Sequence, residues 1–407
     1  MQHDFRPRRR PTTPTQTTDS DEAAAFRTPE TVAAAEDLSV PAHAPVETVT
    51  PVAGWRAKLA VHWPPTKKEA LLSGVAVILL IGALVLAVGH QSPKAAVAAV
   101  PKPVKKAAPK PTTVPSTLSG LPVDPSLNQR PVTAVMIENS LDARPQAGLG
   151  QAGVVFEAIA EGGITRFLAL FQDTAPSDVG PIRSARPYYV QWAMGFDPGY
   201  AHVGGSPEAL QDIKAWGVHD LDQFANGGSY HRVSSRAAPH NVYTAISTLN
   251  QLEASKGLTT STFTGFARKK DAPAKVPTAK TINLNISGPS YNVHYDYDAT
   301  TNSYARSEGG APHIDANTNA QIRPKVVVAL VMPYGLEADD HHSSYGTIGS
   351  GAAYYFQDGT VTTGQWAKSD NASQFVFTDS AGQPMKFNAG QTWLTALGTP
   401  GAVTSAP

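Results

Sequence analysis

The sequence predicts an α+β protein, in which an N-terminal α+β lobe is followed by a smaller β-rich lobe. Short apolar runs bounded by glycine, proline or aspartate recur through residues 120–400 and are typical of strands. Residues 206–216 and 241–257 instead carry the start and stop signals of helices. Before the lobes, the composition predicts a disordered tail, one transmembrane helix and a stalk rich in proline, lysine and alanine.

The composition excludes some classes of protein. The 33 basic residues balance the 33 acidic ones, so the net charge of this 407-residue chain does not favour nucleic acid as a partner. There is no cysteine, which excludes a disulfide scaffold and thiol catalysis. The chain is long enough for two modest lobes after its leader.

The leader is predicted to anchor the chain in a membrane. Residues 1–69 are expected to form a disordered cytoplasmic tail, because they are largely polar and rich in proline and threonine. Residues 70–89 carry no charge and are long enough, as a helix, to cross a hydrocarbon core about 30 Å thick. Arg56, Lys58 and Lys67 precede them, so the positive-inside rule places the N-terminus in the cytoplasm. A cleaved signal peptide is the alternative.

Residues 90–119 are predicted to form a stalk. They consist mainly of alanine, proline, lysine, threonine and valine, a composition that favours an extended chain without a core. We therefore expect a single-pass protein of the cell membrane, with its C-terminal domain held outside the cell in the zone of the wall.

The first lobe is predicted over residues 120–262, with both strands and helices. Ser206 would cap one helix, with Pro207 in its first turn. Asn241 would cap another, with Gly257 as its stop. The strands are expected at residues 132–138, 154–160, 166–172 and 199–203, and the helices at residues 182–193, 206–216 and 242–256.

The second lobe is predicted over residues 278–400 and is dominated by strands. Ile282, Leu284 and Ile286 alternate with polar residues, and residues 326–331 form a continuous apolar run. Asp358-Gly359 is a typical hairpin turn. These signals indicate a small β-rich domain.

Several short motifs keep their order along the chain from about Gly120 to the end, and they resemble the YerB-like family of bacterial envelope proteins, a domain of unknown function (DUF3048). The motifs are RP at 130–131, EN at 138–139, DARPQ at 142–146, EGGITRF at 161–167, VGPIRSARP at 179–187, APHN at 238–241, GSG at 349–351, Gly359, Trp366 and GQTW at 390–393. The resemblance implies a location in the cell envelope and no particular reaction. Members usually carry a lipidated cysteine, which this chain lacks.

Arginines form the first candidate site. Arg183 and Arg186 are spaced by three, so both would lie on one face of a helix over residues 182–193. A guanidinium group can hold a carboxylate or phosphate through two parallel hydrogen bonds. The alternative is internal ion pairing that only shapes the lobe. The further arginines that could join the site are Arg144, Arg166 and Arg232, and the acids that could pair with them are Glu157, Glu161 and Asp178.

Glu157 and Glu161 form the second candidate site. They would lie on one face if the strand continues through both, and paired carboxylates can cleave a glycosidic bond. Under this alternative they are the catalytic residues. Ion pairing with the arginines is the other interpretation.

A third candidate site runs from His202 to Ser206, with His240 and Asn241 downstream. Two glycines between His202 and Ser206 would let a ligand come close to the backbone, and the start of a helix favours an anion. We therefore expect these four residues at a ligand-binding site, with Ser206 as a cap rather than a nucleophile.

No metal site and no cofactor are expected. Residues 339–342 read Asp-Asp-His-His, but adjacent residues on a strand point to opposite sides and cannot all ligate one ion. An exposed hairpin tip fits this run better.

The sequence thus favours an extracytoplasmic protein that binds an anionic cell-wall component or a wall-synthesis partner. The alternatives are a peptidoglycan hydrolase or transglycosylase with paired carboxylates, and a protein–protein scaffold at the membrane.

Overall fold

The computed structural model describes residues 112–407. The predicted tail (1–69), the transmembrane helix (70–89) and most of the stalk lie outside the described residues. Within residues 112–407, every helix is too short or too polar to span a membrane. The end of the predicted stalk belongs to the folded domain, because β1 (Val114–Pro115) pairs with β2 (Pro122–Val123) and Leu118 is buried.

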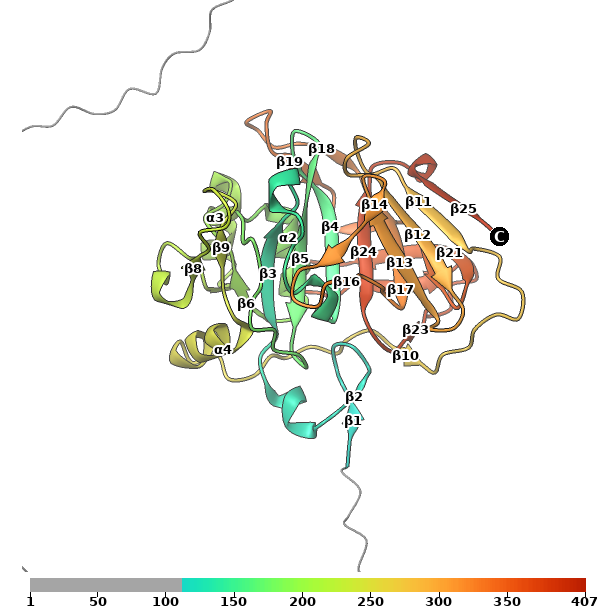
Figure 1. Cartoon of the computed structure of the whole chain (residues 1–407), viewed down its shortest axis with the longest axis horizontal. Coiled ribbons are helices and arrows are strands. Elements are labelled where there is room, and N and C mark those ends of the chain that lie inside the picture. Colours follow the sequence, from blue (N-terminus) through green and yellow to red (C-terminus); the bar gives the residue numbers. More distant parts are fainter. Residues whose placement is uncertain (1–111) are drawn as a thin grey trace, which may run out of the picture. The chain divides into compact units, whose positions relative to one another are not determined.

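A mixed sheet of ten strands forms the centre of the domain (Figure 1). Its strands, in spatial order, are β22 (Val376–Asp379), β21 (Thr360–Lys368), β20 (Gly349–Gln357), β17 (Val326–Val331), β24 (Thr392–Leu397), β4 (Val154–Glu161), β5 (Ile164–Phe171), β3 (Thr133–Glu138), β6 (Gly199–Ala201) and β7 (His219–Asp220).

This sheet joins the two predicted lobes. β24 lies between β17 and β4 and runs parallel to both, with Thr392 opposite Val154 and Thr395 opposite Glu157. The predicted β-rich character is confirmed, but the separation into two lobes differs from the structure. The reason is that β24 returns from near the C-terminus to complete a sheet begun by the first lobe, and local patterns do not encode this pairing.

The strand directions place many loops at one edge of the sheet. β3, β4, β6, β7, β17 and β24 all point the same way, and β5 runs against its neighbours β3 and β4. We call the edge where the six parallel strands end the carboxyl edge. The described chain begins near the opposite edge, where Ser119 donates a hydrogen bond to Asp173, just after β5.

Three helices cover the sheet. α2 (Pro187–Met194) and α3 (Pro207–Ala215) pack on one face with Phe156, and α4 (Ile246–Ser255) packs on the other face with Phe171. Ser206 caps α3 as predicted, because its Oγ accepts a hydrogen bond from the backbone N–H of Ala209 at 3.3 Å.

Two helix predictions were wrong at their starts. α2 begins only at Pro187, since proline favours an extended residue before it and Arg186 has φ −136°. Arg183 and Arg186 therefore do not share a helix face. α4 begins at Ile246, because residues 242 and 243 form β9 (Val242–Tyr243) against β8 (His231–Arg232), so Asn241 does not cap it.

A second, five-stranded sheet packs over the ten-stranded one. Ile282 and Tyr295 of this smaller sheet share a core with Val327 and Phe356. Its spatial order is β14 (Ala311–Pro312), β13 (Ser303–Glu308), β12 (Val293–Asp298), β11 (Thr281–Leu284) and β25 (Val403–Ala406). The remaining strand pairs are β10 (Arg268–Lys269) with β23 (Phe387–Asn388), β15 (Ile314–Asp315) with β16 (Ala320–Gln321), and β18 (Tyr334–Leu336) with β19 (Ser343–Tyr345).

Candidate functional site

The predicted site residues gather mainly at the carboxyl edge of the ten-stranded sheet. Glu138 ends β3, Glu161 ends β4, and His202 follows β6. The segment with Arg183 reaches the same edge, where Ile182 bridges Ile137 of β3. In open α/β sheets, ligands bind in crevices outside the carboxyl ends of the strands. This edge is therefore the candidate site.

Arg166 and Arg186 are held inside the protein by Glu161. Each guanidinium donates to one oxygen of the Glu161 carboxylate, and the two arginine side chains are only 4% and 3% exposed. Burial by itself would raise the pKa of Glu161, but the charges of Arg166 and Arg186 more than offset it and hold that pKa below its ordinary value. Burial also lowers the pKa of Arg166 to about 10. These two predicted ligand-binding arginines are thus already paired with a carboxylate.

Glu157 and Glu161 do not form the expected pair. The register of β4 against β5 shifts between Ile159 and Glu161, so the strand contains a bulge there. The bulge turns Glu161 toward Arg166, which lies on the α2 side of the sheet, whereas Glu157 points to the smaller sheet. The expectation that both carboxylates share one face was wrong for this reason.

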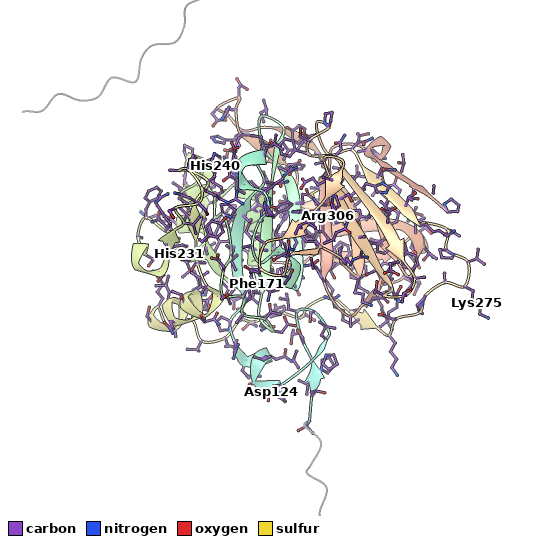
Figure 2. The ribbon with its side chains drawn as sticks, in the orientation of Figure 1. Asp124, Phe171, His231, His240, Lys275 and Arg306 are labelled. Carbon is purple, nitrogen blue, oxygen red and sulfur yellow. The ribbon has the colours of Figure 1, made fainter. Side chains whose placement is uncertain are left out.

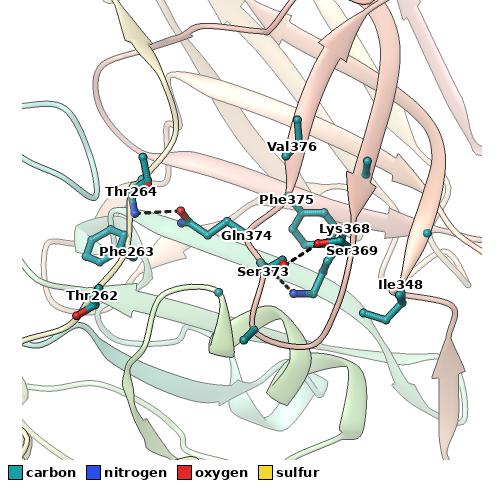
Figure 3. A pocket seen from close by; sticks show the side chains of 15 residues that line it. Thr262, Phe263, Thr264, Ile348, Lys368, Ser369, Ser373, Gln374, Phe375 and Val376 are labelled. Atoms are coloured by element: carbon teal, nitrogen blue, oxygen red, sulfur yellow. Dashed lines mark hydrogen bonds between the residues drawn. The ribbon is translucent and has the colours of Figure 1, made fainter.

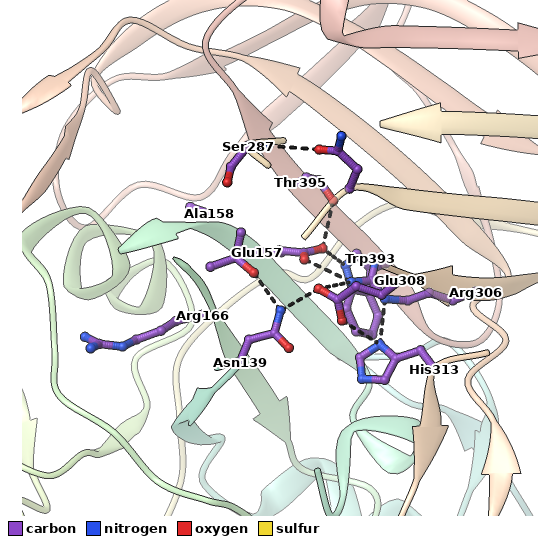
Figure 4. Close-up of polar contacts among 12 residues, drawn as sticks. Asn139, Glu157, Ala158, Arg166, Ser287, Arg306, Glu308, His313, Trp393 and Thr395 are labelled. Carbon is purple, nitrogen blue, oxygen red and sulfur yellow. Dashed lines mark hydrogen bonds and ion pairs between the residues drawn. The ribbon is translucent and has the colours of Figure 1, made fainter. Parts of the chain in front are cut away.

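Glu157 belongs to a buried network between the two sheets (Figure 4). Its oxygens accept hydrogen bonds from Arg306 and from the indole N–H of Trp393, both at 2.9 Å. The Arg306 guanidinium lies 4.4 Å from the centre of the Trp393 ring, and Glu157 and Arg306 are fully buried. We call this group the Glu157–Arg306 network.

His313 extends the network toward the carboxyl edge. Its Nδ1 accepts from Arg306 at 2.8 Å, and its Nε2 faces Gln146 at 2.9 Å, which fits a neutral ring. Burial, with the charges of Arg306 and Arg144, keeps the pKa of His313 well below its ordinary value. Sequence reasoning missed Arg306. The signal was its alternation with Tyr304 on β13, which placed a charge on the buried face of a strand.

Arg183 pairs with Glu138 and is partly exposed. Its Nε lies 3.3 Å from Glu138 Oε1, and its side chain, which is 25% exposed, donates no hydrogen bond to any residue in 112–407. The same Glu138 oxygen lies 2.8 Å from Nδ1 of His240. One carboxylate oxygen therefore faces two basic groups.

His240 also lines an open pocket of about 650 Å³, which we call the basic pocket. Arg236 lies in it and donates to the backbone carbonyls of Asp142 and Pro145, the latter at 2.9 Å. Within the described chain, no carboxylate lies within 4.0 Å of the Arg236 guanidinium. The lining residues are Asp142, Arg144, Ser235, Arg236, Ala237, Ala238 and His240.

Arg236 was also missed by sequence reasoning, although it stands just before the APHN motif at 238–241. The predicted residues Arg232 and Asn241 lie beside it: Arg232 donates to Asn241 at 2.7 Å, and Asn241 donates to the carbonyl of Arg236 at 3.3 Å. Arg144, the remaining predicted arginine, lies 3.2 Å from Glu308.

His202 and Ser206 stabilise a loop. The ring nitrogens of His202, which is fully buried, lie 2.8 Å from the carbonyl of Gly204 and 3.1 Å from Asp220. Ser206 Oγ contacts Ala209 N–H and lies 3.3 Å from Glu337. Both residues lie at the carboxyl edge, but their polar atoms are used by the protein itself.

The Asp-Asp-His-His run lies at the tip of the hairpin formed by β18 and β19, as predicted. Asp339 accepts hydrogen bonds from the backbone N–H groups of His341 and His342. One ligand-type atom each of Glu337, Asp339 and His342 lie within 4.8 Å of one another. Three such atoms do not by themselves make a metal site.

The structure thus divides the predicted site residues into three groups. Those around the basic pocket are Arg144, Arg183, Arg232, His240 and Asn241. Those paired or bonded within the protein at the carboxyl edge are Glu161, Arg166, Arg186, His202 and Ser206. Glu157 lies apart, between the sheets.

Comparisons with known proteins match most of the described residues. The family model described as "Protein of unknown function (DUF3048) N-terminal domain" matches residues 118–259, and its C-terminal counterpart matches residues 282–394. A protein of Bacillus subtilis (strain 168) named "Putative lipoprotein YerB" is 31% identical over 285 residues, which are 69% of this chain and 85% of that protein. The crystal structure of YerB from Bacillus subtilis aligns with a TM-score of 0.66 and 27% identity, and covers 72% of this chain and 100% of the solved chain.

Proposed function

The chain belongs to the DUF3048 family, and we propose that it is a membrane-anchored protein whose extracytoplasmic domain binds an anionic component of the cell wall through the basic pocket and Arg183. The name of the YerB relative describes a lipoprotein, and this supports a place at the outer side of the cell membrane. The predicted transmembrane helix would supply the anchor that a lipidated cysteine supplies elsewhere.

The observation that carries the proposal is the Arg183 guanidinium group, which is 25% exposed and pairs with Glu138 only through its Nε. Its side chain donates no hydrogen bond within residues 112–407, although a planar guanidinium can hold a carboxylate or phosphate through two parallel bonds. Arg236 adds a second positive charge, which donates to two backbone carbonyls and pairs with no carboxylate of residues 112–407. An anion that reaches these guanidinium groups would gain contacts that the protein does not make by itself.

The basic pocket lies away from the first described residues. Asp124 lies near the start of the described chain, at the lower end of the domain in Figure 2, and His240 lies at the upper end. The start of the folded domain therefore does not cover the pocket.

We do not propose the glycan-cleaving alternative. A general acid needs a raised pKa, and the pKa of Glu161 is lowered by Arg166 and Arg186 once burial is overcome. Glu157 is fully buried and accepts hydrogen bonds from Arg306 and Trp393, so substrate cannot reach it without opening the core.

Co-sedimentation of the full-length chain in detergent with isolated cell walls tests the proposal. We expect binding that weakens as salt is raised and falls several-fold in Arg183→Ala. Arg323→Ala is the matched control. Arg323 is 42% exposed and lies beside Asp298, at the end of β12 in the five-stranded sheet.

Three results would contradict the proposal. Equal loss of binding in Arg183→Ala and Arg323→Ala would indicate nonspecific charge attraction. Release of sugar fragments into the supernatant would favour the enzyme. Failure of the full-length chain to sediment with walls would favour a scaffold that contacts a membrane protein.

A further inference from the structure

An open groove of about 810 Å³ lies on the opposite side of the domain core from α4, between residues 262–265 and the loop that precedes β22 (Figure 3). Gly195, at the end of α2, also lines it. The groove is separate from the basic pocket, since the two share no lining residue. We call it the Lys368 groove, and the side chains that matter most are Phe263, Ile348, Lys368, Gln374, Phe375 and Val376.

Lys368 is the charged residue that lines this groove, and it is buried without an ion pair. Its exposure is 2%, and Nζ donates to the backbone carbonyls of Asn371, at 3.0 Å, and Ser373. An ammonium group carries three protons, and the two carbonyls accept two of them. Nζ also lies 5.9 Å from the centre of the Phe375 ring, which is a cation–π contact and not an anionic partner. No carboxylate of residues 112–407 lies within 4.0 Å of Nζ. A buried cation without a counter-ion is costly unless something pairs with it.

Gln374 supplies a second free donor in the same groove. Its Oε1 accepts from the backbone N–H of Thr264 at 3.1 Å, which fixes the orientation of the amide. Its Nε2 is buried and has no partner among the described residues. Two unused donors and no acidic lining residue make this groove complementary to a carboxylate.

The rest of the lining is apolar or carries hydroxyl groups. Ile348 and Val376 are 44% and 59% exposed at the groove, and Phe263 and Phe375 lie along it. Scattered apolar residues are ordinary on a surface, but these line one groove around the two free donors. The ligand should therefore carry small apolar groups next to its charge.

We propose that the Lys368 groove is a second binding site, for a carboxylate at the end of a short apolar chain. Two sources share this chemistry: the C-terminus of a peptide with small apolar side chains, and a short fatty acid. The carboxylate pairs with Lys368 and accepts from Gln374, while the chain packs on Ile348 and Val376.

Carboxylate binding at the Lys368 groove should depend on pH, because it requires the charged form of Lys368. Burial lowers the pKa of Lys368 to about 8, and the charge of Asp370 acts in the opposite direction. The ammonium form is the one that pairs with a carboxylate, so binding should weaken as pH rises above that value. Asp370 is the nearby acid, and it already accepts from the backbone of Ala372 and Ser373.

Calorimetric titration of the full-length chain in detergent with N-acetyl-alanyl-valine, its C-terminal amide and hexanoate tests the proposal. We expect the peptide carboxylate or hexanoate to bind at least tenfold more tightly than the amide, and the tighter of the two identifies the source. Equal binding of carboxylate and amide would overturn the proposal, as would failure of both carboxylates to bind.

A matched variant separates binding from folding. Gln374→Glu keeps an oxygen for the N–H of Thr264 and replaces the free donor with an acceptor, so the loop should persist while carboxylate affinity falls at least tenfold. Unchanged affinity in Gln374→Glu would contradict the site. Arg183→Ala should leave this affinity unchanged, which distinguishes failure of this proposal from failure of the wall-binding function.

Discussion

The Glu157–Arg306 network and the basic pocket contain the same kinds of charged side chain, but these side chains differ in pairing and in burial. In the network, each charge is buried and has a partner: Arg306 pairs with Glu157 and stacks on Trp393. Beside the basic pocket, Arg183 and His240 share one oxygen of Glu138, and in the pocket Arg236 donates to two backbone carbonyls and has no carboxylate partner within the described chain. A structural ion pair and a candidate binding site are therefore distinguished by the pairing and exposure of their side chains, and not by residue type.

Removal of Arg306 should have the largest effect on stability. Arg306→Ala leaves Glu157 buried without a cation, so we expect the free energy of unfolding to fall by about 3–5 kcal/mol. Urea denaturation measures this, with Arg323→Ala as the exposed control. A loss no larger than that of the control would remove the distinction between the two regions.

Glu253 is a carboxyl group in the core without a cationic partner among the described residues, so its ionisation should lower the free energy of unfolding. It is fully buried on α4, and burial raises its pKa to about 8, opposed by a hydrogen bond from Thr133. Since the folded pKa lies above the unfolded value, its stabilising contribution is complete below about pH 4.5 and is lost as pH rises toward 8. Glu253→Gln should abolish this decline, which is worth about 5 kcal/mol.

Denaturation of both proteins at acid and alkaline pH checks this prediction. Parallel stability profiles for the wild type and Glu253→Gln would show that Glu253 is ionised in the fold. That outcome would also weaken the view that buried charges in this domain require partners.

Glu161 should behave as a structural residue. Glu161→Gln leaves Arg166 and Arg186 facing each other without an anion, and we expect a loss of about 2 kcal/mol in the free energy of unfolding. The measurement is the urea midpoint, compared with that of Arg323→Ala. Full stability would mean that the two arginines are available for ligand after all.

Arg236 should show the smallest effect on stability and a clear effect on binding. Because Arg236 is partly exposed and contacts only backbone carbonyls by hydrogen bonds, Arg236→Ala should change the free energy of unfolding by no more than about 1 kcal/mol. Wall binding should nevertheless fall several-fold. A large loss of stability with unchanged binding would place Arg236 with the buried network instead.

Local patterns predicted the strands and one helix well. Apolar runs located β3, β4 and β5 within a few residues, and Ser206 before Pro207 marked the start of α3. These features depend on neighbours in sequence. The resemblance to the family, carried by ordered short motifs, was confirmed.

The features that the sequence did not predict depend on contacts between residues that are far apart in sequence. Glu157 and Arg306 are 149 positions apart, and no periodicity indicates that they meet. The bulge before Glu161 changes the face of one side chain, which a regular strand cannot predict. Among arginines near one another in sequence, the position of the partner determines which one stays accessible: Arg186 is buried against Glu161, whereas Arg183 is 25% exposed beside Glu138.

The most direct test of the account is wall binding by the double variant Arg183→Ala/Arg236→Ala, measured at several salt concentrations beside Arg323→Ala. We predict that the double variant stays folded, loses most of its wall binding and shows a weaker salt dependence than the control. Wall binding equal to that of Arg323→Ala, by a protein that is still folded, would contradict the central claim that the basic pocket holds the anion.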